Sequence, residues 1–414
     1  MDLAAARHEP ERWRAALERK GSGALFDEVL ALDRRKREVQ TRVEQLRSAQ
    51  KVKGKPTPEQ LEELQRTKPE LQASERELGP LEEELERLLM RLPNPPEDDA
   101  PSGGEDDFAV LREVGEPPAF DFEPRDHHEL AAERGWIDLE RGAKVSGARF
   151  AYRIGDLALT ELALYRWALG RLVGKGFTPV LPPVLVREAA MYGTGFLPTD
   201  EVNIYRVERD DLYLTGTSEV ALAAFHEDEI LDEAELPLRY AGYSTNFRRE
   251  AGAAGKDTRG MFRVHQFDKV EMFVLCRPGE SQEVHSELLA IEEELVDELG
   301  VPYRVVDIAA GDLGASAARK FDVEAWFPGQ RCYREITSTS NTTDFQARRL
   351  GIRHRPPGAK RPEPVHTLNG TAVTARALLA VLENFQDAEG SVTVPDCLVE
   401  FGAPSRLGAV RAPA

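Results

Sequence analysis

The sequence predicts an α+β protein in which an N-terminal antiparallel helical hairpin precedes a mostly antiparallel sheet surrounded by helices. Three observations support this prediction. Apolar residues recur every three, four and seven positions between residues 26 and 92, as in two helices of a coiled coil. Beyond residue 107 the pattern changes to short strand-like runs mixed with helical ones. Hairpins and short returns outnumber repeated βαβ units there, which favours antiparallel pairing.

The helical arm is predicted from its leucines and valines. The repeat comprises Val29, Leu32, Val39, Val43 and Leu46 in the first half, and Leu61, Leu64, Leu71, Leu78, Leu81, Leu85 and Leu88 in the second. Residues 54–58, Gly-Lys-Pro-Thr-Pro, predict the turn between the helices. About 25 residues at ~1.5 Å each make the first helix about 40 Å long. Pro69 and the pair Gly79-Pro80 are expected to kink or interrupt the second helix.

The two arm helices differ in charge. Residues 33–55 carry nine basic and three acidic side chains, a net charge of +6. Residues 57–91 carry ten glutamates against five lysines or arginines, a net charge of −5. One interpretation is charge pairing between the helices, with the other charges in water. The other is that the basic helix and the tip of the arm grip an RNA backbone.

A linker is expected at residues 96–106. The Pro-rich segment 92–96 and the acidic run that follows it carry no apolar period. The linker separates the arm, residues 1–95, from a larger domain, residues 107–414.

Within the larger domain, apolar residues at 157–172 have helical spacing, and residues 178–181 and 212–214 read as strands. The sequence contains no G-x-x-x-x-G-K-[ST] motif and no Gly-rich turn between a strand and a helix. A P-loop or Rossmann nucleotide site is therefore not expected.

Composition indicates a soluble globular protein of two or three domains, with 414 residues of which 41% are hydrophobic. The net charge of −19 argues against general nucleic-acid binding, but a local basic strip can coexist with an acidic body. Cys276, Cys332 and Cys397 form no CxxC pair, so a reducing cytosol is expected and a disulfide framework or cysteine zinc site is not. Neither a signal peptide nor an apolar run of 18 residues is found, so no membrane association is expected.

The most informative stretch runs from Tyr243 to Phe273. It predicts two strands around a loop that contains Gly252, Gly255 and Gly260 as well as Lys256, Asp257 and Arg259. The facing strands are expected to carry Arg248, Glu250, Arg263 and Glu271. Such charges are costly to bury unless a charged ligand completes them, and a guanidinium forks onto phosphate or carboxylate oxygens. The alternative is an exposed strand pair with cross-strand salt bridges.

Two other stretches offer oxygen atoms. Thr217, Ser218 and Glu219 supply hydroxyls and a carboxylate, although the same residues also make an ordinary helix start. Glu335, followed by hydroxyls at residues 337–340, offers hard ligands for Mg²⁺, or is a polar strand end.

The small residues of 368–375 would let a backbone or a planar ligand approach closely. Arg376, at the start of a helix over 377–384, could then stack on a purine or bind a phosphate. Residues 182–186 and 193–198 are expected to be architectural.

In their order, a Pro-bearing strand and helix, a Phe-Arg-x-Glu hairpin and a Gly-containing turn ending in Arg resemble the three motifs of class II aminoacyl-tRNA synthetases. The segments that resemble the bacterial seryl-tRNA synthetase family are TSE at 217–219, FRREAGAAGKDTRG at 247–260, RVHQFDKVE at 263–271, EITSTSNTTDFQARR at 335–349 and VLENFQ at 381–386. The N-terminal hairpin and the PNPP linker extend the resemblance to nearly the whole chain. It implies a tRNA-binding arm at 1–95 and a class II catalytic domain at 107–414.

The resemblance also implies roles for single residues. Arg248 would hold the α-phosphate of ATP and the serine carboxylate, Glu250 would lie near the adenine amino group, and Phe267 and Arg376 would sandwich the adenine. The implied serine-binding residues are Thr217, Ser218, Glu219, Arg248, Glu271 and Thr371. The implied ATP-binding residues are Arg248, Arg249, Glu250, Val264, Phe267, Glu335, Ile336, Thr337, Ser338 and Arg376. Arg248 and Arg376 would be catalytic, and Glu335 and Ser338 would hold Mg²⁺.

The implied reaction joins serine to ATP as seryl-adenylate, releases pyrophosphate, and passes serine to the 3′ end of a tRNA. The implied partners are ATP, L-serine, serine tRNA, selenocysteine tRNA as a further acceptor, and a second copy of the chain through the Pro183 region. Magnesium and a cytoplasmic location are implied, and zinc is not. Two alternatives stay open, a paralogue that hands serine to another acceptor and a catalytically silent regulator. The joint presence of Arg248, Glu335 and Arg376 argues against the regulator.

The chain departs from the family pattern in three places. Thr337 and Thr339 stand where Ser and Cys are common. Four residues separate Thr371 from Arg376, one fewer than usual. The arm is also shorter than the family's usual arm.

Overall fold

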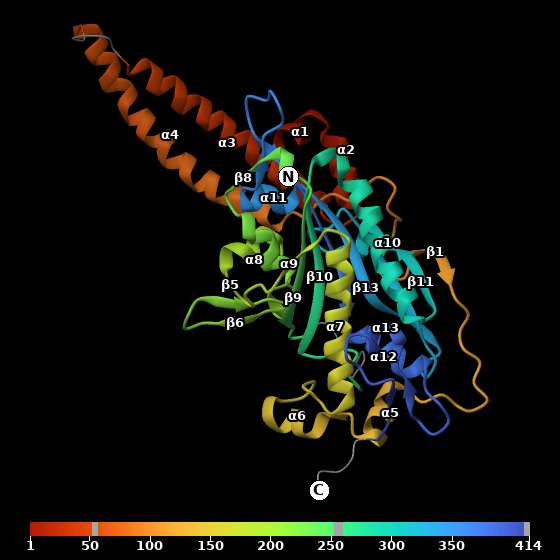
Figure 1. The fold of residues 1–414 in the computed structure, drawn as a ribbon. Coiled ribbons are helices and arrows are strands. Elements are labelled where there is room, and N and C mark those ends of the chain that lie inside the picture. Colours follow the sequence, from red (N-terminus) through yellow and green to blue (C-terminus); the bar gives the residue numbers. More distant parts are fainter. Residues whose placement is uncertain (52–56, 252–259, 410–414) are drawn as a thin grey trace. The chain divides into compact units, whose positions relative to one another are not determined.

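The structure is a computed structural model that describes residues 1–51, 57–251 and 260–409. The chain divides into two compact units, Met1–Pro95 and Pro96–Ala414 (Figure 1). We describe each unit by itself.

The described residues of the first unit form four helices, and the two long ones pack side by side (Figure 1). The helices are α1 (Leu3–His8), α2 (Pro10–Glu18), α3 (Gly23–Ala49) and α4 (Pro58–Arg91). The buried seam between α3 and α4 includes Val39, Val43, Leu71 and Leu81, as the heptad spacing predicts. α4 begins with a capping box in which Thr57 and Gln60 bond each other's backbone N–H groups. Most of the predicted turn lies in residues 52–56, outside the described residues.

Ion pairs join the basic helix to the acidic one. They are Arg35 with Glu77, Lys36 with Glu82, Arg42 with Glu70, and Arg47 with Glu75. Charge pairing between the helices, one of the two interpretations above, is therefore confirmed at these positions. Exposed pairs of this kind contribute at most about 1 kcal/mol each, so the apolar seam carries more of the arm's stability.

The prolines were expected to kink or interrupt the second helix, and the interruption is wrong, because α4 runs as one helix through Pro69 and Pro80. Each proline removes a backbone donor from the helix. The apolar side chains beside them, Leu71 and Leu81, are buried in the seam with α3. Tertiary packing thus offsets the local cost.

The second unit is built on an eight-stranded sheet with the order β1-β11-β12-β13-β16-β10-β9-β4 (Figure 1). In that order the strands are β1 (Ala109–Val114), β11 (Tyr303–Asp307), β12 (Arg319–Phe327), β13 (Cys332–Thr343), β16 (His366–Thr374), β10 (Gln266–Cys276), β9 (Leu238–Phe247) and β4 (Thr178–Val180). Neighbouring strands pair antiparallel except β4 and β9, which are parallel. The predicted α+β class with a mostly antiparallel sheet is confirmed.

The longest helices of the second unit pack on this sheet, namely α7 (Asp156–Gly174), α10 (Ser281–Leu299) and α12 (Ala375–Asn384). Their buried faces join the sheet in one large apolar core. The shorter elements are α5 (His127–Arg134), β2 (Ile137–Asp138), α6 (Leu139–Ser146), β3 (Tyr152–Arg153), β5 (Leu185–Arg187), α8 (Glu188–Thr194), β6 (Tyr205–Val207), β7 (Leu212–Leu214), α9 (Glu219–Ala223), β8 (Ile230–Leu231), α11 (Phe345–Leu350), β14 (Arg353–His354), β15 (Glu363–Pro364), β17 (Val392–Thr393), α13 (Asp396–Val399) and β18 (Arg406–Leu407).

The central hairpin is shorter than predicted. β9 ends at Phe247 and β10 begins at Gln266, so Arg248, Glu250 and Arg263 lie beyond the paired strands and not on them. Beyond the end of β9, Glu250 adopts a positive φ of 51°. The predicted loop residues Gly252, Gly255, Lys256, Asp257 and Arg259 lie outside the described residues.

Candidate active site

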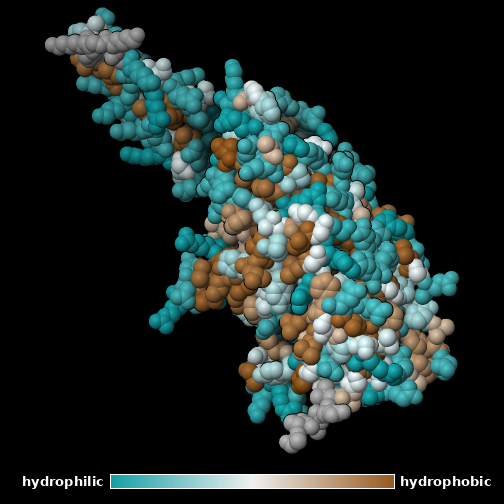
Figure 2. Space-filling model, viewed as in Figure 1, coloured by the Kyte–Doolittle hydropathy of each residue, from teal (hydrophilic) through white to brown (hydrophobic). Residues whose placement is uncertain are grey.

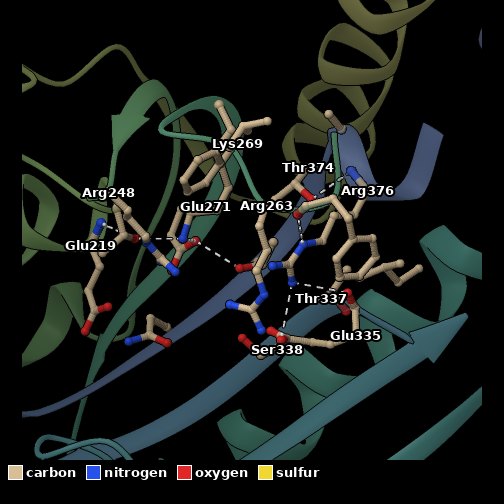
Figure 3. A pocket seen from close by; sticks show the side chains of 18 of the residues that line it. Glu219, Arg248, Arg263, Lys269, Glu271, Glu335, Thr337, Ser338, Thr374 and Arg376 are labelled. Atoms are coloured by element: carbon tan, nitrogen blue, oxygen red, sulfur yellow. Dashed lines mark hydrogen bonds and ion pairs between the residues drawn. The ribbon is translucent and has the colours of Figure 1, made fainter. Parts of the chain in front are cut away.

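A cavity of about 400 Å³ lies at the ends of the central strands and holds nearly all of the predicted site residues (Figure 3). The predicted residues that line it are Thr217, Glu219, Arg248, Glu250, Val264, Phe267, Glu271, Glu335, Ile336, Thr337, Ser338, Thr371 and Arg376. They come from segments that are far apart in the sequence. The sheet thus gathers them into one site.

Ser218 and Arg249 do not line this cavity. The Ser218 side chain is buried, with its hydroxyl 3.5 Å from the carbonyl oxygen of Gly242. The Arg249 guanidinium donates to the carbonyl oxygen of Ile204 at 2.9 Å and lies over the Tyr205 ring. These two side chains are therefore directed away from the cavity that the other predicted residues share, and their binding roles stay predictions. Each directly follows a cavity residue, and its side chain is directed elsewhere.

One end of the cavity holds two glutamates and a lysine (Figure 3). Lys269 contacts Glu271 as an ion pair and donates to the Thr217 hydroxyl at 2.7 Å. The Thr371 hydroxyl lies 3.4 Å from the Glu271 carboxylate. Glu219 begins α9, and its backbone N–H donates to the Thr217 hydroxyl at 3.2 Å. This end offers carboxylates and hydroxyls to a small ligand that carries an ammonium group and a hydroxyl.

The Glu219 carboxyl has a shifted acidity. Burial and the nearby charge of Glu271 raise its pKa, while Lys269 and hydrogen bonds from Gln346 and Asn369 lower it, and the result is a pKa of about 7. The Gln346 amide, from α11, donates to Glu219 at 2.7 Å. Near neutral pH this carboxyl is therefore balanced between its two protonation states, and a nearby cation would ionise it.

A β-bulge in β13 sets which side chains face the cavity. Glu335 and Thr337 pair with successive residues of β12, so Ile336 is an extra residue in β13. Side chains alternate along a strand, but the extra residue shifts that alternation by one. Glu335 and Ser338, three positions apart, consequently lie on the same face of the sheet.

A second bulge acts in β16. Thr371 and Val373 pair with successive residues of β10, so Ala372 is the extra residue. Thr371 lies directly opposite Glu271. The shortened spacing between Thr371 and Arg376 therefore still leaves the threonine in the cavity.

The other end of the cavity surrounds Glu335 with cations. The Arg376 guanidinium lies 3.3 Å from the Glu335 carboxylate and also donates to the carbonyl oxygen of Phe262 at 3.3 Å. Partial withdrawal from water raises the pKa of Glu335, but Lys320, Arg376 and Arg248 together lower it to about 2. The carboxylate is thus ionised at neutral pH, and 41% of its side chain is exposed. It is available as a hard oxygen ligand.

Aromatic rings pair with both predicted catalytic arginines. The Arg248 guanidinium lies over the Phe267 ring, 5.3 Å from its centroid, and donates to the carbonyl oxygen of Gly216 at 3.0 Å. The Arg376 guanidinium lies 4.5 Å from the centroid of Phe262. These contacts hold both cations at the cavity wall.

Several groups of the site were missed from the sequence. Lys269 could have been predicted from the sequence, because it stands two positions before Glu271 and therefore on the same face of β10. Lys320 and Gln346 carried none, because only the sheet and α11 bring them to the site. Glu292 of α10, whose carboxylate accepts a bond of 3.0 Å from Thr337, was equally hidden, and burial raises its pKa well above the ordinary value.

In the part of the chain that the structure describes, no group of three or more His, Cys, Asp or Glu side chains is placed to hold a metal ion. None of the helices within those residues is long and apolar enough to cross a membrane.

Two family models match the chain. The N-terminal domain of seryl-tRNA synthetase matches residues 1–96, and the class II tRNA synthetase core domain of the G, H, P, S and T enzymes matches residues 205–385. The two matches together span the arm and the central part of the catalytic sheet.

Similar proteins cover nearly the whole chain. A serine–tRNA ligase of Thermobifida fusca is 53% identical over 410 residues, which is 97% of each chain. The crystal structure of seryl-tRNA synthetase from Pyrococcus horikoshii complexed with ATP has a TM-score of 0.94 and 40% identity, covering 99% of this chain and 100% of that one. The structure of a cytoplasmic serine–tRNA ligase from Naegleria fowleri in complex with AMP has a TM-score of 0.88 and 35% identity over 97% and 96% of the two chains. The chain therefore belongs to the seryl-tRNA synthetase family and is a class II aminoacyl-tRNA ligase.

Proposed function

We propose that this chain activates L-serine with ATP and transfers the serine to the 3′ end of serine tRNA. One observation carries the proposal. A single cavity joins the buried glutamates Glu219 and Glu271 to the cations Arg248 and Arg376 and the ionised Glu335. The first pair suits the ammonium and hydroxyl of serine, and the second group suits the phosphates of a nucleotide.

The serine would lie between β10, β16 and α9. A carboxylate there pairs with the ammonium group, and Glu271 with Thr371 and Thr217 offers bonds to the hydroxyl. Alanine would leave these buried polar groups unpaired, whereas threonine would need room for one more methyl group. Arg248 is placed to bind the serine carboxylate and the α-phosphate together.

Magnesium would be held by Glu335 and Ser338, whose oxygens share one face of β13 because of the bulge at Ile336. The donors fit this ion, since Mg²⁺ prefers hard oxygens, keeps several waters and commonly binds through one or two carboxylates and substrate phosphates. When bound, it would offset charge on the phosphates.

The chain's own residues would act mainly by position and charge. Arg248 and Arg376 hold the reacting carboxylate and phosphate in line and stabilise the charge that develops as pyrophosphate leaves. Glu250 and Phe267, with Val264 and Ile336, line the wall where the adenine would lie. The step needs no nucleophilic side chain, since the substrate carboxylate is the nucleophile.

The arm, residues 1–95, would bind the tRNA, with residues 96–106 as linker and residues 107–414 as the catalytic domain. Not all of the basic charge of α3 is used in the pairs with α4, since Arg34 is exposed and no ion pair of Arg34 occurs among the described residues. Selenocysteine tRNA would be a further acceptor. Contacts between the basic side chains of α3 and the phosphates of a tRNA would weaken as the salt concentration rises.

A cytoplasmic location and a homodimer are the remaining parts of the proposal. The homodimer is supported by apolar side chains that gather on the face of the second unit that carries α7, α8 and β5 (Figure 2). Leu162 of α7 is 60% exposed, and Leu181, two positions before Pro183, is 80% exposed. Large side chains of this kind grouped on one face mark an interaction surface.

The test is serine-dependent exchange of pyrophosphate into ATP, followed by charging of serine tRNA with the same preparation. We expect both activities. Exchange without charging would favour a paralogue with another acceptor. A folded protein without exchange for any amino acid would contradict the proposal and leave the silent regulator.

A further inference from the structure

Lys269 is the least expected charge of the site. Its side chain lies on β10 beside Glu271, and Lys269, Glu271 and Glu219 are exposed by only 5%, 2% and 7%. A buried ammonium group is costly unless oxygens surround it. Here two oxygens do so, the Thr217 hydroxyl at 2.7 Å and the Glu271 carboxylate in an ion pair.

The net charge of this pocket balances the one ammonium group of serine only when the charge of Lys269 is included. With Glu219, Glu271 and Lys269 all ionised, their net charge is −1, which one serine ammonium brings to zero. Two carboxylates without the lysine would repel each other, and one would retain a proton. A lysine without Glu271 would instead oppose the incoming ammonium.

We propose that Lys269 is a positioning residue that neutralises Glu271, so that Glu271 receives the serine hydroxyl while Glu219 is left to pair with the serine ammonium. The inference rests on the proposed serine activation. It assigns the two carboxylates different tasks through a residue that need not touch serine.

The decisive comparison is between Glu271→Gln and the double variant Lys269→Met with Glu271→Gln. The single variant leaves Lys269 without its carboxylate, so the pocket is neutral and binds an ammonium poorly. The double variant restores a net charge of −1 from Glu219. In pyrophosphate exchange we expect the serine KM of the double variant to be about tenfold below that of Glu271→Gln, since charges in contact are strongly coupled. The KM for ATP should be the same in both.

The pH profile gives a second readout. The charged groups around Glu219 are Lys269 and Glu271 of β10, with Arg248 lining the same cavity, and its polar partners are Gln346 and Asn369. In Lys269→Met the two carboxylates share a proton to higher pH, so the fall of serine KM with rising pH should move upward by about one pH unit. Loss of packing alone would not move this profile.

A serine KM of the double variant equal to or above that of Glu271→Gln would overturn the role of Lys269. This comparison does not require Lys269→Met alone to fold, and thermal unfolding checks that the other two variants do. Failure of the wild-type chain to exchange with serine would instead contradict serine activation itself. The two failures are therefore distinguishable.

Discussion

Glu219 and Glu335 belong to the same cavity, but their surroundings shift their pKa values in opposite directions. Burial next to another glutamate raises the first to about 7, whereas three cations lower the second to about 2. One carboxyl is thus poised to be ionised by a ligand, and the other is permanently charged. Environment, more than residue type, divides the work.

The first prediction concerns pH. Because the raised pKa of Glu219 means that the charged form is lost as pH falls below about 7, serine should bind more weakly in acid. We expect serine KM to rise by about fivefold between pH 7 and pH 6 and to level off above pH 8. Exchange kinetics across this range measure it, with the KM for ATP as the internal control. A flat serine KM would contradict the assigned ammonium partner.

A second prediction concerns Glu335. Glu335→Gln removes the charge proposed to hold Mg²⁺, so the exchange rate should fall about 100-fold and the Mg²⁺ concentration for half-maximal rate should rise. The matched control is Glu324→Gln, since Glu324 pairs with Glu335 across the strands but bonds Arg304. Equal effects of the two substitutions would count against a metal ligand at Glu335.

Lys269 and Gln346 show why the site could be predicted only in part. Lys269 and Glu271 lie in one strand, and their spacing of two residues predicts that their side chains share a face. Gln346 reaches Glu219 from an element 127 positions away in the chain. No periodicity encodes that distance, because strand order and helix docking decide it.

At the scale of elements, the arm helices follow the apolar repeat, and packing along that repeat outweighs local helix-breaking residues. The heptads predicted the seam, and the prolines that argued against a continuous α4 were outweighed by packing. The strands were harder to predict. β9 and β10 were recognised, but their ends and the bulges of β13 and β16 depend on hydrogen-bond register between distant segments.

A third prediction follows for α4. Beyond its neighbours in the helix, a methyl group on Gly79 would meet no atom within 4 Å. Gly79→Ala should therefore gain helix propensity, offset in part by contact with the Pro80 ring, and stabilise the arm by at most about 0.5 kcal/mol. Gly21 has equally open space but a φ of 65°, so Gly21→Ala should destabilise it by about 1 kcal/mol. Thermal unfolding followed by circular dichroism compares them. The same sign for both changes would refute the argument.

At the scale of the whole molecule, the chain combines a unit stabilised by an apolar seam with one stabilised by a large sheet core. Composition indicated two or three domains, and contacts divide the chain into two compact units. The overall charge of −19 said little about RNA, because it hides a local excess of positive charge, +6 over residues 33–55.

The fourth prediction is at this scale. Leu181→Asp places a charge on the exposed apolar face, so a dimer formed there should dissociate to a monomer, while the fold stays intact because the side chain is 80% exposed. Light scattering after size-exclusion chromatography measures the mass. Leu61→Asp, at an exposed leucine of the arm, should leave the mass of the wild-type assembly unchanged. A dimer that persists in the Leu181→Asp variant would place the interface elsewhere.

Because of the bulge at Ile336, the number of residues in β13 matters as much as their identity for which side chains face the cavity. A strand is read two residues at a time, and the extra residue works like an inserted base in a reading frame. If the same residues were paired without the bulge, those beyond Ile336 would be read in the other frame, so that Ser338 would point into the core and the buried Thr337 would point out. Deleting Ile336 would instead remove the bulge and keep the frame, because Glu335 and Ser338 would then stand two positions apart. A one-residue gap at this position in an alignment of relatives is therefore compatible with the same cavity face.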